Sequence, residues 1–157
     1  MPKNLKDIVF VSALRTSIGK LNGVYSKYKS HELGALVIKE ILNRTNLDPK
    51  KIDEVIMGQV LTGLTGQNPA RQSAINANIP VEKTAYIINQ VCGSGLRSVA
   101  AAYQSILLND AKIIIAGGQE SMSNSTEEAM LKDGLIDAYN NYHMGVTAEN
   151  IAEKWNI

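Results

Sequence analysis

Residues 88–105, INQVCGSGLRSVAAAYQS, form the stretch that decides the predicted fold. The stretch begins in a β-rich run, passes through glycines, and continues as a helical pattern whose apolar members recur at i, i+3, i+4, i+7 and i+11. Those members are Leu96, Val99, Ala100, Tyr103 and Leu107. Cys92, the single cysteine among 157 residues, stands where the strand pattern ends. The stretch therefore predicts a strand, a turn that carries a thiol, and a helix.

The same alternation of strand and helix runs through the first 118 residues. Apolar, β-rich runs predict strands at 8–13, 52–60, 84–91 and 112–118, and helical periodicity predicts helices at 30–46, 69–78 and 95–108. Asn68 is suited to cap the second helix, with Pro69 at its first position. The run at 112–118 is continuously apolar, which is typical of a strand in the middle of a parallel sheet. We therefore expect an α/β fold with right-handed βαβ crossovers, and ligands beyond the carboxyl ends of the strands.

The character of the sequence changes after Gly118. Residues 119–148 are polar and show no clear strand pattern, and a helical pattern returns only at 149–157. We expect a unit at 1–119 followed by a second unit that begins at 120. Because no closing strand or cap precedes residue 157, we also expect the sequence to be part of a longer chain.

Composition excludes several classes of protein. A hydrophobic content of 45%, a charged content of 20% and a net charge of +1 give no electrostatic basis for binding nucleic acid or an acidic membrane. One cysteine allows neither an internal disulfide nor a cysteine-based zinc cluster. The lysines before residue 8 faintly resemble a signal peptide, but Arg15 ends the apolar run and no cleavage pattern follows. No apolar run reaches about 18 residues, so we expect a cytoplasmic protein without a spanning helix.

The position of Cys92 suggests acyl transfer. A thiol reacts as its thiolate, and the first turn of a helix favours an anion through its unpaired N–H groups and the helix dipole. Gly93 and Gly95 leave room for a sharp turn and for an approaching substrate. The same N–H groups can stabilise the oxyanion that forms when the thiolate attacks a carbonyl. The competing interpretation is an inert thiol packed in the core, which is common for a lone cysteine.

Other readings of the motifs are weaker. GSGLRS resembles a dinucleotide-binding G-x-G-x-x-G, but Ser98 replaces the third glycine and no acidic residue follows about 20 positions on; GLTGQN lacks the Lys-Ser/Thr end of a P-loop. Either of the two histidines could serve as a base for the thiol. His31 is predicted to be a surface residue at a helix start. His143 lies in a polar, loop-like stretch where contact with a substrate is easier.

Taken together, several stretches resemble the thiolase family, and within it the acetyl-CoA acetyltransferases. These are RTSIGK, GQNPAR, NQVCGSGLRSV, IIIAGGQESMSN, DGLIDA and YHMGVTAEN, which follow one another in the family's order over essentially the whole chain. The resemblance implies the first half of a thiolase-like fold, with residues 1–119 as its α/β part and 120–157 as the beginning of the loop domain. In such proteins two similar α/β halves pack together in each subunit.

The resemblance also implies the chemistry. Cys92 would be acetylated by acetyl-CoA and pass the acetyl group to the enolate of a second acetyl-CoA, giving acetoacetyl-CoA in a Claisen condensation. Leu135, His143 and Met144 would contact the acyl and pantetheine end of the substrate. Coenzyme A thioesters would be substrates, and no resident cofactor or metal is implied. The strand before Cys92 lies at the subunit interface of family dimers, so we expect a homodimer or a higher homo-oligomer.

The sequence departs from the family in two ways. The Gly-His-Pro, Asn-Glu-Ala and second cysteine motifs, and the last strand of the first half, are not present. We therefore expect the N-terminal portion of a thiolase, inactive alone unless a separate C-terminal half complements it. The stretch at 124–132 is also shorter than the family's loop, which makes a tetramer doubtful. A non-catalytic remnant that self-associates is the alternative, and a 3-ketoacyl-CoA thiolase or a decarboxylating condensing enzyme is less well matched.

Overall fold

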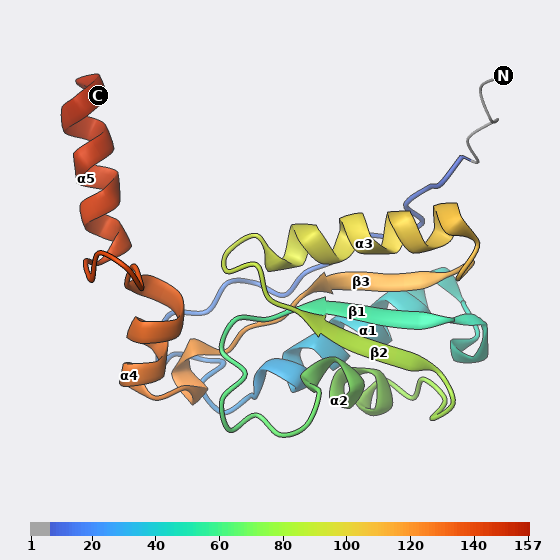
Figure 1. Ribbon diagram of the computed structural model, residues 1–157. Helices are drawn as coiled ribbons and strands as arrows, with labels where there is room; N and C mark the ends of the chain where they lie inside the picture. Colours follow the sequence, from blue (N-terminus) through green and yellow to red (C-terminus); the bar gives the residue numbers. More distant parts are fainter. Residues whose placement is uncertain (1–6) are drawn as a thin grey trace, which may run out of the picture.

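The computed structural model describes residues 7–157 of the chain, and its centre is a three-stranded parallel sheet. The strands are β1 (Glu54–Gly58), β2 (Thr84–Ile88) and β3 (Ile114–Gly118), in the order β2-β1-β3. The helices are α1 (Ser30–Thr45), α2 (Pro69–Asn76), α3 (Ser94–Leu108), α4 (Glu127–Ala129) and α5 (Met144–Trp155). Shorter helical turns are η1 (Pro49–Lys51), η2 (Met122–Asn124) and η3 (Met130–Leu135). The predicted α/β class with parallel strands is confirmed (Figure 1).

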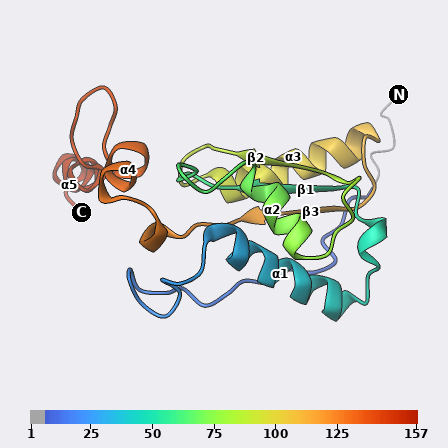
Figure 2. The same cartoon turned by 90° about the horizontal axis from the view of Figure 1, so that it is seen from below.

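The sheet is layered between helices. Strand β1 is the central strand, and its last four residues are buried. Helices α1 and α2 cover one face of the sheet and α3 covers the other, as Figure 2 shows. Because all three strands are parallel, their carboxyl ends lie at one edge, where β1 and β3 end on Gly58 and Gly118 side by side.

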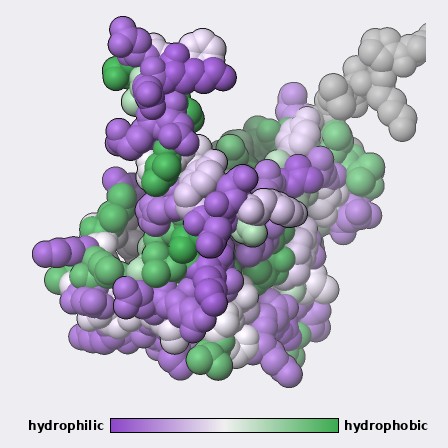
Figure 3. Space-filling view, turned by 60° about the vertical axis from the view of Figure 1, so that its left-hand side comes forward, coloured by the Kyte–Doolittle hydropathy of each residue, from purple (hydrophilic) through white to green (hydrophobic). Residues whose placement is uncertain are grey.

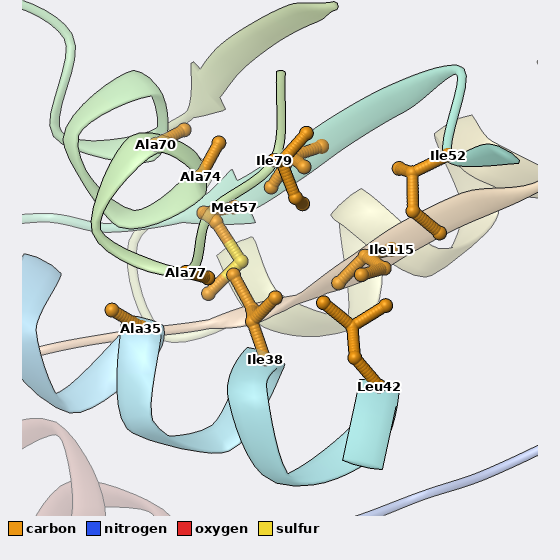
Figure 4. Close-up of a cluster of buried hydrophobic side chains, with 11 residues drawn as sticks. Ala35, Ile38, Leu42, Ile52, Met57, Ala70, Ala74, Ala77, Ile79 and Ile115 are labelled. Carbon is orange, nitrogen blue, oxygen red and sulfur yellow. The ribbon is translucent and has the colours of Figure 1, made fainter. Parts of the chain in front are cut away.

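The core lies between α1, α2 and the sheet (Figure 4). Its members are apolar side chains that are at most 8% exposed: Ala35, Ile38, Leu42, Ile52, Val55, Met57, Ala70, Ala74, Ala77, Ile79 and Ile115. Three of them come from α1 at positions i, i+3 and i+7, which is the stripe that a core-facing helix presents. Burying each large aliphatic side chain contributes about 1.5–3 kcal/mol.

The ends of the helices follow local sequence signals. Asn68 caps α2 by accepting a hydrogen bond from the Arg71 N–H at 3.1 Å, and Pro69 occupies the first position, as predicted. Helix α1 begins at Ser30 with Lys29 as its N-cap, and the Glu32 carboxylate accepts from the Lys29 N–H at 2.8 Å. It ends at Thr45, where Asn46 takes a left-handed φ of 50°.

The predicted first strand, residues 8–13, is wrong. This stretch forms no strand, and Val9, Phe10 and Val11 are 72%, 82% and 80% exposed. A strand forms only where its backbone groups find a neighbouring ladder, and a cavity separates this stretch from β3. Strand β3 is consequently an edge strand, although its sequence is typical of the middle of a parallel sheet.

The part of the chain after β3 is helical and open. Helices α4 and η3 occupy residues that the sequence presented as polar and irregular, and α5 begins at Met144, five residues before the predicted helix. Figures 1 and 3 show α5 standing away from the rest, with hydrophobic and polar side chains both exposed on it. Within residues 7–157, no helix is both long and apolar enough to cross a membrane.

Candidate active site

Cys92 lies in the turn between β2 and α3, at the carboxyl edge of the sheet. Its thiol is free and the residue is exposed, so the interpretation of an inert thiol packed in the core is wrong. The turn is short, since four residues separate the end of β2 from the cap residue Gly93. The sequence therefore places its only thiol at an accessible strand-to-helix junction, as predicted.

The turn that carries Cys92 is held by two neighbouring polar side chains. Asn89 Oδ1 accepts a hydrogen bond from the Val91 N–H at 2.9 Å. The Ser94 hydroxyl accepts from the Gln90 N–H at 2.8 Å and donates to the Val91 carbonyl at 2.6 Å. Val91 has φ 48°, an unfavourable conformation for a β-branched residue. The local hydrogen bonds compensate for this strain and fix the backbone on both sides of the thiol.

Glycines bring the start of α3 down onto the sheet. A Cβ built on Gly58 would lie 2.3 Å from the Ser94 carbonyl carbon and 2.5 Å from the Gly95 nitrogen. A Cβ on Gly118 would lie 3.3 Å from the Gly95 Cα. Only glycines at the ends of β1 and β3 therefore allow the first turn of α3 to sit at this depth. The Gly93 and Ser94 N–H groups, which follow Cys92 directly, donate to the Gln90 and Val91 carbonyls at 3.1 Å, so it is the positive end of the α3 dipole that favours a negative charge beside the thiol.

No side chain within residues 7–157 donates a hydrogen bond to Cys92 or accepts one from it. His31, which we predicted to be a surface residue, is only 8% exposed at the start of α1, so that prediction is wrong. Just before α1, Ser121 and Asn124 donate hydrogen bonds to the Tyr28 carbonyl at 2.8 Å. Burial lowers the pKa of His31 and so favours its neutral form.

The sequence analysis missed a set of polar residues at the ends of β1 and β3. The Gln119 amide donates to Gln59 Oε1 at 2.9 Å, and Gln119 Oε1 accepts from the Ser73 hydroxyl at 2.6 Å. These three side chains are buried. Their signal in the sequence is a polar residue directly after each strand-ending glycine, in GQ at 58–59 and GGQE at 117–120. The network ties the carboxyl ends of two strands and α2 together.

Glu120 follows this network at the same edge. Its Oε2 accepts from the Val60 N–H at 2.8 Å and from the Leu61 N–H at 3.4 Å, whereas its buried Oε1 has no hydrogen-bond partner. Burial raises the pKa of Glu120, and the backbone N–H groups of Val60, Leu61 and Ser121 oppose that rise. Val60 also accepts, through its carbonyl, a 3.5 Å hydrogen bond from the Asn89 amide of the Cys92 turn. Glu120 is therefore linked to that turn through one shared residue.

The three residues predicted to bind substrate lie close together beyond β3. An isolated antiparallel bridge between Ile136 and His143 brings Leu135 near His143 and Met144. His143 Nδ1 accepts from the Gly145 N–H at 2.9 Å and caps α5, so Nδ1 is unprotonated and the remaining ring nitrogen is the donor. Met144 is 41% exposed. Gly134, next to Leu135, lies close to Leu61, which follows the end of β1. A Cβ placed on Gly134 would be 3.9 Å from a Leu61 methyl carbon.

No group of three or more histidine, cysteine, aspartate or glutamate side chains gathers within residues 7–157. The chemical groups at this edge are a thiol, a buried carboxylate, amides and backbone N–H groups.

Comparison with known proteins identifies the family. The family model for the "Thiolase, N-terminal domain" matches residues 8–129 and 124–157, two ranges that overlap at 124–129. An acetyl-CoA acetyltransferase of Paracoccus denitrificans is 51% identical over 95% of this chain and 42% of its own length. An acetyl-CoA acetyltransferase of Cupriavidus necator is 47% identical over 98% of this chain and 43% of its length. The cytosolic acetyl-CoA acetyltransferase of Mus musculus is 45% identical over 96% and 42%.

The chain spans less than half the length of these curated relatives, and the matches cover nearly all of it. The predicted resemblance to the N-terminal portion of a thiolase is therefore confirmed. With Cys92 at the start of α3 and a parallel sheet beneath it, this chain belongs to the thiolase family through its N-terminal domain.

Proposed function

We propose that this chain provides the acyl-accepting thiol of an acetyl-CoA acetyltransferase. In the first step, the Cys92 thiolate attacks the carbonyl carbon of acetyl-CoA. A C–S bond to Cys92 forms, the C–S bond to coenzyme A breaks, and coenzyme A leaves as its thiolate. In the second step, a base supplied outside residues 7–157 removes an α-proton from another acetyl-CoA. The resulting carbanion displaces Cys92 from the acetyl carbon and yields acetoacetyl-CoA, so that the cysteine thiolate is regenerated.

The observation that carries this proposal is the exposed Cys92 in a rigid turn at the start of a fifteen-residue helix. The hydrogen bonds of Asn89 and Ser94 hold the turn, and the positive end of the α3 dipole favours the anionic sulfur and a developing oxyanion. A thioester on sulfur keeps the acetyl group activated for its second transfer. The names of the relatives point to the same acyl group.

The proposal gives the region after β3 a role in substrate recognition. Residues 1–119 would form the α/β part and residues 120–157 the beginning of a loop domain. Leu135, His143 and Met144 would face the acyl and pantetheine end of acetyl-CoA, with the free N–H of His143 as a donor. Coenzyme A thioesters are the proposed substrates and no resident cofactor is required. A cytoplasmic location and a homo-oligomer remain predictions.

The 157-residue chain alone should give negligible turnover. No base touches Cys92 within residues 7–157, and the relatives are more than twice as long as the chain. Residues that act as a unit in catalysis lose most of their effect when members are missing. Full turnover would then require the remaining thiolase sequence, which a separate C-terminal half could supply.

The test separates an activated thiol from a remnant. The rate of Cys92 alkylation by iodoacetamide is measured near pH 7 against free cysteine, and the chain is incubated with acetyl-CoA and analysed by intact mass. We expect faster alkylation than free cysteine and the gain of one acetyl group, both lost in Cys92→Ser. An alkylation rate equal to that of free cysteine with no acetylation would contradict the proposal and favour a non-catalytic thiolase remnant.

A further inference from the structure

The three residues that follow β1, at 59–61, connect the ends of all three strands. The Gln59 N–H donates to the carbonyl of Ile88, the last residue of β2, at 3.1 Å. On the other side of β1, the Gln119 N–H donates to the Gly58 carbonyl at 2.9 Å. Figure 1 shows the chain leaving β1, β2 and β3 at the same end of the sheet. A displacement of residues 59–61 would therefore be felt by both neighbouring strands.

Glu120 holds this segment from the side of β3. Its Oε2 accepts hydrogen bonds from the Val60 N–H at 2.8 Å and from the Leu61 N–H at 3.4 Å. The Gln59 side-chain amide donates to the Leu61 carbonyl at 2.8 Å, which stiffens the segment from within. One carboxylate oxygen thus fixes the backbone of two consecutive residues.

The carboxylate of Glu120 is an expensive group to place here. Its other oxygen, Oε1, is buried and has no hydrogen-bond partner within residues 7–157. Burying a carboxylate with one oxygen unpaired is unfavourable for folding. An unsatisfied buried group of this kind calls for an explanation other than stability. The groups to which Oε2 is bonded supply one.

The turn that carries Cys92 is bonded to the same segment. The Asn89 amide donates to the Val60 carbonyl at 3.5 Å, and Asn89 Oδ1 accepts from the Val91 N–H at 2.9 Å. The Val60 carbonyl and the Leu61 N–H belong to one planar peptide group. Glu120 and Asn89 therefore bond to opposite ends of that group, and a hydrogen bond at one end strengthens the bond at the other.

Val91 is where this chain of hydrogen bonds ends. Its φ of 48° is unfavourable for a β-branched residue, and such a conformation persists only where its neighbours hold it. The bond from its N–H to Asn89 and the bond from the Ser94 hydroxyl to its carbonyl are those holds. Because Cys92 follows Val91 directly, the place of the thiol at the start of α3 depends on this conformation.

We propose that Glu120 is a positioning residue for Cys92. It acts through the peptide group after Val60 and through Asn89 on the strained backbone of Val91. Its effect is to keep the thiol beside the positive end of the α3 dipole. The inference rests on the proposed function, since the position of the thiol matters for catalysis only if the thiol reacts. What the position requires is an acceptor oxygen on residue 120.

Two measurements on the 157-residue chain test the proposal. One is the rate of Cys92 alkylation by iodoacetamide near pH 7, and the other is the hydrogen-exchange rate of the Val91 N–H. Glu120→Ala should slow alkylation and speed exchange by about three- to tenfold each, as expected for the loss of one hydrogen bond. Because Cys92 is already exposed, a looser turn cannot speed alkylation by improving access. Glu120→Gln keeps a carbonyl oxygen and should restore both rates.

Two further variants separate positioning from stability. Leu42→Ala is the matched control, because it removes a core side chain between α1 and the sheet and touches none of these hydrogen bonds. It should destabilise the chain and leave the alkylation rate unchanged. Val91→Gly removes the strain, since glycine adopts a positive φ freely. Adding Glu120→Ala to a Val91→Gly chain should therefore change the alkylation rate much less than it does in the original chain.

Several results would overturn the proposal. Val91 exchange that does not respond to Glu120→Ala would do so, as would an activated Cys92 whose alkylation rate does not fall in that variant. An equal fall in Leu42→Ala, or an undiminished fall in the Val91→Gly background, would show that the effect is one of stability. The proposed function fails separately: a Cys92 that reacts no faster than free cysteine would refute it, while Val91 exchange that responds to Glu120→Ala would still support the link to the turn.

Discussion

Replacing Gly58 by Ala tests whether the start of α3 depends on the end of β1. The added methyl carbon would lie 2.3 Å from the Ser94 carbonyl carbon and 2.5 Å from the Ser94 oxygen and the Gly95 nitrogen. Carbon atoms in contact are normally about 3.5–4.0 Å apart. The first turn of α3 would therefore have to retreat by on the order of 1 Å, since the obstructing atoms are backbone and cannot rotate away.

The expected loss of unfolding free energy is about 3 kcal/mol, the upper end of the usual range for overpacking. For a chain of this size, this loss lowers the melting temperature by roughly 9 °C. Urea titration followed by circular dichroism measures the change. Gly63→Ala is the matched control, because a Cβ there meets nothing within 4 Å. The retreat of α3 should also change the rate at which iodoacetamide modifies Cys92. A Gly58→Ala chain as stable as the control, with unaltered Cys92 reactivity, would refute the reasoning.

Four other substitutions follow from the structure. Cys92→Ser should abolish alkylation and change the unfolding free energy by less than about 0.5 kcal/mol, since the residue is exposed; a larger loss in urea titration would contradict its surface position. Ser73→Ala removes the donor to Gln119 Oε1 and should lower the unfolding free energy by about 1–3 kcal/mol, whereas Thr65→Ala, which removes only a solvent-exposed hydrogen bond to the Thr62 carbonyl, should lower it by much less. Leu42→Ala removes a side chain that is 6% exposed and should lower the unfolding free energy by about 2–5 kcal/mol. Leu36→Ala removes one that is 49% exposed and should lower it by less than about 1 kcal/mol. Because burial raises the pKa of Glu120 above 4.5, its contribution to stability is present below pH 4.5 and is lost as the pH rises through the raised pKa. Glu120→Gln should remove this component from the pH dependence of the unfolding free energy, and parallel curves for the two chains would argue against it.

Local patterns predicted the elements that are fixed by local physics. Helices α1, α2 and α3 and the three strands lie within a few residues of their predicted positions, because apolar periodicity and the Asn68–Pro69 start signal act over short distances. The place of Cys92 followed from the same patterns, since a strand ends and a helix begins on either side of it.

What the sequence did not predict depends on partners distant in the chain. Residues 8–13 have the composition of a strand, but strand formation requires a neighbour, and none lies beside them in the described chain. His31 was assigned to the surface because it begins a helix, and the sequence does not show that Ser121 and Asn124, about 90 residues away, bond to the nearby Tyr28 carbonyl. The bonds among Ser73, Gln59 and Gln119 likewise join segments that only the fold brings together.

The outlying position of α5 has a consequence for optical measurements on this protein. The single tryptophan, Trp155, sits at the end of α5 and is 66% exposed, far in sequence from every member of the core. Its fluorescence will therefore report the environment of α5, and it should shift to shorter wavelength when another surface covers that helix. The melting of the sheet and its helices should leave this emission almost unchanged, so the lone indole is a selective reporter of docking.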